Sequence, residues 1–161
     1  MLSLLLADES VLYMTTRDYH WNLIGSEFPG LPHLLEVQYG QIADWVDQVA
    51  ALARTTGLDA GAERDWVDLI NSARVSADPG ISLSGGRMLS ELLALHGKII
   101  GQLRLDRASG AGRFNDVGAA DFLTGLMEWH EKTAARLRAQ LETEEDASTR
   151  DRSVEMAGTR S

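Results

Sequence analysis

The residues that could bind a metal gather in one segment, residues 18–53, which contains no lysine or arginine. Its candidate ligand side chains are Asp18, His20, Glu27, His33, Glu36, Asp44 and Asp47. Acidic residues on a helix usually have basic partners three or four residues away, so their absence indicates that water or a cation supplies the opposing charge. The whole chain lacks cysteine, and histidine and carboxylate ligands without thiolates suit iron, manganese or zinc.

The later part of this segment predicts a helix with two different faces. At about 100° per residue, one side of residues 31–53 is apolar and predicts a face that packs into a helical bundle. A second side, roughly 150° away, carries Glu36, Asp44 and Asp47, with His33 close to them. A polar helix face is most often solvated, and a lone histidine is more often structural than a ligand. From spacing alone, hydration and metal binding both stay open.

Short motifs near both ends of the chain carry a family resemblance. The sequence contains YHWNLIG at residues 19–25, WVDQVA at residues 45–50 and GAADFLTGLMEWHEK at residues 118–132. In these motifs the chain resembles the Dps family of mini-ferritins. The resemblance implies an all-α fold, a ferritin-like four-helix bundle with a short extra helix in the long crossover between the second and third helices.

The resemblance also implies a di-iron ferroxidase site shared between two subunits. An ungapped alignment places His20, Glu36 and Asp47 at metal-ligand positions, where they would also be the catalytic residues. Two further ligand positions differ, because Pro32 stands in place of a histidine and Ala51 in place of a glutamate. We therefore expect an altered ferroxidase site.

Three neighbouring residues could modify this site. His33 lies about 60° from Glu36 on an ideal helix and is a further candidate metal ligand. Whether His33 or Asp44 replaces a missing ligand stays open. Trp21, beside the candidate site, would either intercept stray oxidising equivalents or fill the subunit interface.

Two aspartates precede or open the last predicted helix. Asp116 and Asp121 suit the positive end of that helix dipole. By resemblance, they could instead line acidic pores through which iron enters a hollow shell.

Composition excludes several other classes of protein. A chain of 161 residues with 44% hydrophobic residues is long enough for one domain with a sizeable core. The net charge of −9 opposes general nucleic-acid binding, which depends on lysine and arginine. The first residues lack the basic region of a signal peptide, and no apolar stretch approaches the roughly 20 residues of a membrane helix. These features lead us to expect a cytoplasmic protein with no membrane partner.

Hydrophobic periodicity predicts four long helices and one short one. A bundle domain is expected over residues 1–143. A flexible tail is expected over residues 144–161, because that segment is mixed in charge and poor in bulky apolar residues. His96 falls on an apolar helix face, where a buried, hydrogen-bonded histidine is expected rather than a ligand. The predicted helices cover residues 3–23, 31–56, 62–75, 87–106 and 117–141.

The resemblance implies a concrete function. The protein would form a homo-oligomeric shell of twelve subunits, with metal sites at two-fold interfaces, and would sequester and store iron (Fe2+/Fe3+) or another divalent metal. It would oxidise Fe2+, with peroxide the preferred oxidant, and so protect against oxidative damage. The first alternative is a catalytically weak or inactive shell with a structural or metal-binding role. The second is a DNA-binding nucleoid protein, which is disfavoured because no lysine-rich segment precedes the first predicted helix.

Overall fold

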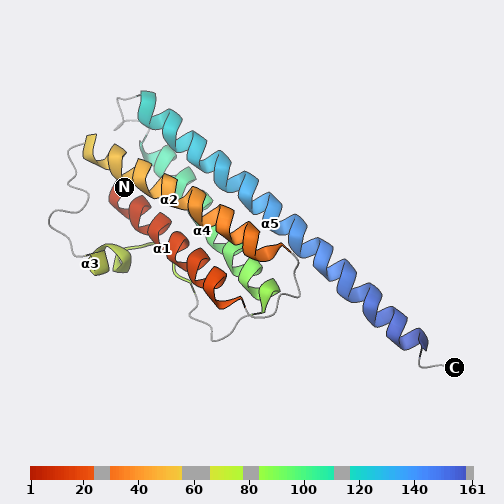
Figure 1. Cartoon of the computed structure of the whole chain (residues 1–161). Helices are drawn as coiled ribbons and strands as arrows, with labels where there is room; N and C mark the ends of the chain where they lie inside the picture. The colour runs from red at the N-terminus through yellow and green to blue at the C-terminus, as the bar shows by residue number, and fades with distance from the viewer. Residues whose placement is uncertain (24–29, 56–65, 78–83, 111–116, 159–161) are drawn as a thin grey trace.

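The structure is a computed structural model that describes residues 1–23, 30–55, 66–77, 84–110 and 117–158. All regular structure in these ranges is helical, as the sequence predicts. Four long helices lie side by side, and a short helix sits near one end of the bundle (Figure 1). The helices are α1 (Leu2–Asn22), α2 (Leu31–Thr55), α3 (Trp66–Asn71), α4 (Gly85–Gly110) and α5 (Val117–Gly158).

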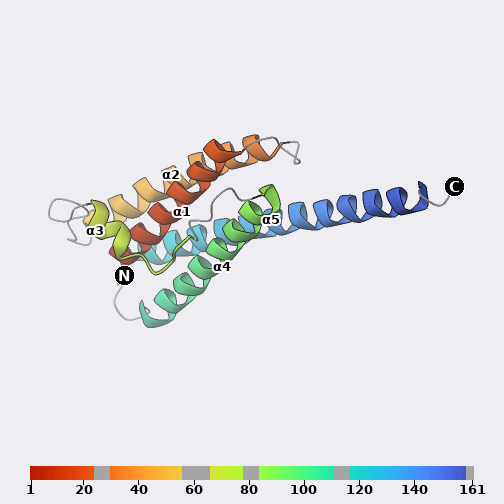
Figure 2. The ribbon, with the colours of Figure 1, turned by 90° about the horizontal axis from the view of Figure 1, so that it is seen from below.

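The bundle consists of two helical pairs. Helix α1 packs mainly on α2, and α4 packs mainly on α5. Seen from below, the first pair forms one layer and the second pair forms the other (Figure 2). Leucine and isoleucine side chains from all four helices fill the space between the layers, and each fully buried one contributes about 1.5–3 kcal/mol to stability. The apolar stripe predicted for residues 31–53 points into this core, where Leu31, Leu35, Ile42, Val49 and Ala53 are buried.

A buried ion pair fixes the chain that follows α3. Asp8 on α1 is fully buried and accepts hydrogen bonds from the backbone N–H of Arg74 at 2.6 Å and from its Nε at 2.8 Å. The same guanidinium donates through Nη1 to Asp106 on α4 at 2.9 Å. Charge-assisted bonds of this kind hold the crossover against both helical pairs.

The last helix is longer than the sequence analysis predicts. We expected it to end near Leu141, but α5 continues to Gly158 and extends well past the other helices (Figure 1). Residues 142–157 contain no glycine or proline and many strong helix formers, so local propensity favours continuation of the helix. The residues expected to form a tail thus have helical backbone as far as Gly158. The division into a bundle of residues 1–143 and a flexible tail of residues 144–161 stays a prediction.

The short helix that the sequence predicts in the crossover is present as α3. Helix α3 is shorter than the predicted 62–75, and residues 62–65 lie outside the described part of the chain. In the part of the chain that the structure describes, no helix is both long and apolar enough to cross a bilayer.

Candidate functional site

The carboxylate face of α2 lies on the surface of the isolated chain. Glu36, Asp44 and Asp47 are all exposed. His33 is one turn before Glu36, and its Nδ1 lies 3.8 Å from the Glu36 Oε2, with side chains 80% and 60% exposed. Within the described ranges, no lysine or arginine forms an ion pair with Glu36 or Asp47. This face therefore offers oxygen ligands that remain available to a cation.

The other predicted ligand lies near the end of α1. His20 is half-buried, and its ring packs edge-on against Tyr39 of α2 with centroids 5.4 Å apart. The His20 Nδ1 atom is buried and has no hydrogen-bond partner among the described residues. An imidazole nitrogen in that state can act as a metal ligand without first breaking an internal bond.

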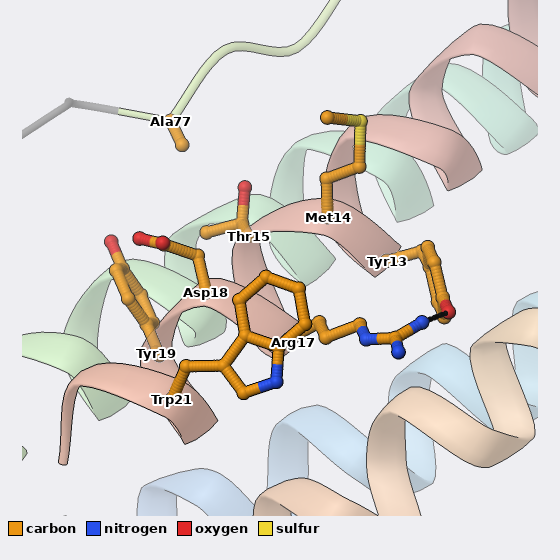
Figure 3. A pocket seen from close by; sticks show the side chains of 8 residues that line it. All are labelled: Tyr13, Met14, Thr15, Arg17, Asp18, Tyr19, Trp21 and Ala77. Carbon is orange, nitrogen blue, oxygen red and sulfur yellow. Dashed lines mark hydrogen bonds between the residues drawn. The ribbon is translucent and has the colours of Figure 1, made fainter.

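Trp21 lines a cavity of about 450 Å³ along the last turns of α1 (Figure 3). Its side chain is 66% exposed, and the Arg17 guanidinium carbon lies 5.0 Å from its ring centroid, within the range of a cation–π contact. Arg17 also donates a hydrogen bond to the Tyr13 hydroxyl. The wall is mostly apolar and aromatic, and it consists of Tyr13, Met14, Thr15, Arg17, Asp18, Tyr19, Trp21 and Ala77.

The structure of a single chain does not bring the predicted ligands together. Among the residues that it describes, no three histidine, aspartate or glutamate side chains converge as a metal site. Pro32 and Ala51, which replace two expected ligands, are both exposed on α2. Of the two aspartates considered for a pore, Asp121 is exposed on α5, and Asp116 lies outside the described residues.

A second histidine–carboxylate group lies in the core, and only part of it was predicted. His96 on α4 is fully buried, as expected from its apolar helix face. Its Nδ1 lies 2.8 Å from the Nδ1 of His130 on α5, and the Nε2 of His130 lies 2.8 Å from the Glu9 Oε1 on α1. Burial lowers the pKa of His96 well below 6.5, and the nearby charge of His130 lowers it further.

The Trp129 ring packs against both histidines of this buried group. The Trp129 ring centroid lies 4.9 Å from that of His130 and 5.7 Å from that of His96. Trp129 Nε1 donates to Gln41 Oε1 on α2 at 3.3 Å, and Trp45 packs against the Trp129 ring. Helical spacing could have revealed Glu9, because it lies on the same face of α1 as Leu5 and Leu12, which are both fully buried.

Comparisons with known proteins agree with the fold. Residues 1–147 match the family model of the ferritin-like domain. The chain is 35% identical over 138 residues to an uncharacterised low temperature-induced protein of Nostoc sp., covering 85% of this chain and 75% of that protein.

Two solved structures extend the likeness. The chain is similar to Dps from Thermosynechococcus elongatus, with 29% identity, a TM-score of 0.75 and 87% of each chain covered. It is also similar to a Dps protein from Vibrio cholerae that is described as one of the ferritin-like diiron-carboxylate proteins. That match has 27% identity and a TM-score of 0.77, and it covers 87% of this chain and 86% of that one.

Proposed function

Since the chain belongs to the ferritin-like family and has the fold of Dps proteins, we propose that it is an iron-storing mini-ferritin. In this proposal, copies of the chain assemble into a shell that takes up Fe2+, oxidises it with peroxide as the preferred oxidant, and retains the ferric product. Removing Fe2+ and peroxide together would limit oxidative damage.

The observation that carries the proposal is the set of available ligands on α1 and α2. His20 presents a ring nitrogen without an internal partner, and Glu36 and Asp47 present carboxylates without a basic partner among the described residues. An imidazole with two carboxylates is a donor set that suits iron. Carboxylate oxygens would also stabilise the higher charge of the ferric product.

A second copy of the chain would complete the site. The three predicted ligands come from two helices and do not converge within one chain. Glu36 and Asp47 are exposed and so accessible to a neighbouring subunit, and His20 is half-buried, so we propose metal sites shared across a two-fold interface in a shell of twelve subunits. Asp121 on the exposed surface of α5 is a candidate for the lining of an iron entry pore.

The altered ligand set favours a second candidate function. Pro32 and Ala51 offer no metal ligand where the Dps pattern has a histidine and a glutamate. The His33 imidazole, 3.8 Å from Glu36, could supply one of the missing donors. If it does not, the chain would form a shell that binds or stores metal with little oxidase activity. A role in DNA binding ranks third, because the net charge of −9 opposes phosphate contacts.

One experiment separates the two leading candidates. The molecular mass of the purified protein is measured by analytical ultracentrifugation, and Fe2+ oxidation is then followed by stopped flow with peroxide and with oxygen. A large homo-oligomer that oxidises Fe2+ faster with peroxide supports the first proposal. The same oligomer without oxidation above the buffer rate supports the inactive shell. A monomer would exclude both.

A further inference from the structure

The buried side chains of Glu9, His130 and His96 form a continuous polar chain across the bundle. Each residue is fully buried, and each comes from a different helix. The two links in the chain are both 2.8 Å long. This polar chain connects the layer of α1 and α2 to the layer of α4 and α5, within a core formed mostly by leucine and isoleucine side chains.

The geometry limits where protons can lie. His130 Nε2 faces a carboxylate oxygen, and its Nδ1 faces the corresponding nitrogen of His96. Each of these contacts requires one proton between the two heavy atoms. If Glu9, His130 and His96 held only those two protons, Glu9 would be ionised and both imidazoles would be neutral. One uncompensated negative charge would then lie in the core.

A third proton removes this charge. With a proton on His96 Nε2 as well, the proton between the imidazoles lies on His130 Nδ1, and the three residues carry no net charge. The proton between Glu9 and His130 then lies either on His130 Nε2, which makes an imidazolium beside a carboxylate, or on Glu9, which leaves His130 neutral. Burying a balanced ion pair costs far less than burying a single charge, so full burial favours the state in which the three residues carry no net charge. The His96 Nε2 atom is buried without a hydrogen-bond partner among the described residues, so no neighbouring donor occupies that position.

Among the described residues, Glu9 forms its ion pair with His130, and no lysine or arginine pairs with it. Asp8, next to Glu9 on α1, is paired with Arg74. Glu91, which precedes His96 on α4, accepts a hydrogen bond from the Tyr19 hydroxyl. On the α2 side, the side chains that reach this region are the neutral Gln41 and Trp45, which contact Trp129.

We propose that Glu9, His130 and His96 form a buried proton-binding site that joins the two helical layers and makes their docking dependent on pH. This site is separate from the candidate metal ligands, and it does not depend on the proposed iron chemistry. At high pH, loss of the third proton leaves the Glu9 charge unbalanced. At low pH, a further proton binds His96 Nδ1. Two N–H groups, one on each Nδ1 atom, then face each other, and the hydrogen bond between His96 and His130 is lost.

Solid-state NMR of protein with ¹⁵N-labelled histidine tests the proton count directly at pH 7.5. We expect His130 to carry protons on both ring nitrogens and His96 to be neutral with its proton on Nε2. The Glu9→Gln variant removes the carboxylate charge, and we expect the second ring proton of His130 to be lost. His33→Gln, which changes an exposed histidine on α2, is the matched control and should leave both core signals unchanged.

Two results would overturn the proposal. A wild-type His130 with its single ring proton on Nε2, together with a His96 protonated only on Nδ1, would show that the three residues do not hold the third proton. A doubly protonated His130 in Glu9→Gln would show that Glu9 does not control the site. If Glu9→Gln fails to fold, the wild-type spectrum still decides. The second measurement is then the number of protons released on urea unfolding at pH 8, which should be about one per polypeptide.

Discussion

Two regions of this protein contain the same residue types in opposite environments. On the outer face of α1 and α2, His20, His33, Glu36 and Asp47 are partly or fully exposed. In the core, Glu9, His96 and His130 are completely buried. The exposed set has few internal partners, whereas each buried residue is hydrogen-bonded to another member of its group.

This difference shows how burial determines the role of a histidine–carboxylate group. A solvated carboxylate can exchange water for a cation at little cost, so the exposed face is suited to binding. A buried carboxylate must have its charge balanced within the protein, so the core group is suited to holding helices together. Residue type alone would assign both groups to metal chemistry.

The largest expected effect contrasts stability at the two sites. Glu9→Gln should lower the free energy of unfolding by about 1–3 kcal/mol, because the buried charge pair is lost and a neutral hydrogen bond from His130 replaces the charge-assisted one. Glu36→Gln, an identical chemical change on the surface, should stay within about 0.5 kcal/mol of the wild type. Urea unfolding followed by circular dichroism measures both. Equal losses in the two variants would show that burial does not distinguish the regions.

The rate of Fe2+ oxidation should depend on the carboxylates of the outer face. Asp47→Asn should slow Fe2+ oxidation by at least about tenfold, because losing even an indirect partner of a metal ligand typically costs 10–100-fold. Asp68→Asn, on the exposed face of α3, is the matched control and should leave the rate unchanged. Stopped-flow absorbance with peroxide gives the initial rates. An unaffected Asp47→Asn variant would remove that residue from the site.

The sequence predicts the fold because core packing follows local periodicity. Residues such as Leu35, Ile42 and Val49 recur at helical spacing, and the structure buries each of them. His96 could be placed in the core for the same reason. The end of α5 could not be predicted by this method, because residues 142–157 have helix propensity without an apolar stripe, and periodicity detects only the stripe.

The buried chain was harder to predict because its partners are far apart in sequence. Glu9 and His130 are separated by 121 positions, and nothing local to either indicates the other. For the outer face, the sequence predicts the residues but not how they come together. Its ligand types and exposed position could be read from residues 18–53, but their convergence depends on a second copy, which one sequence does not place.

Acid should weaken the core. Burial lowers the pKa of His96 in the folded state, so below about pH 6.5 the unfolded chain binds more protons than the folded one. The contribution of His96 to stability is therefore fully present above pH 6.5 and is lost as the pH falls, at about 1.4 kcal/mol per pH unit for one proton.

Urea unfolding between pH 5 and pH 7 measures this slope. His96→Phe should reduce it, because the titrating group is gone. His33→Gln should not change it, since that imidazole is 80% exposed. The same slope in His96→Phe and the wild type would assign the acid sensitivity to another group.

The smallest expected effect is a gain of activity at the outer face. Ala51 is exposed on α2 where the Dps pattern has a glutamate ligand, so Ala51→Glu restores a carboxylate without disturbing the core. Glutamate is a good helix former, and the stability should change by less than about 0.5 kcal/mol. We expect Fe2+ oxidation to become severalfold faster, because the added oxygen ligand would hold the metal and stabilise the ferric state.

Ala51→Gln is the matched control for this gain, because it adds the same length without the charge, and its rate should equal that of the wild type. If Ala51→Glu were no faster than Ala51→Gln, position 51 would not face the metal, and the ungapped alignment that placed Glu36 and Asp47 in the site would be wrong. The gain thus tests the register of the whole outer face, which loss-of-function variants alone cannot do.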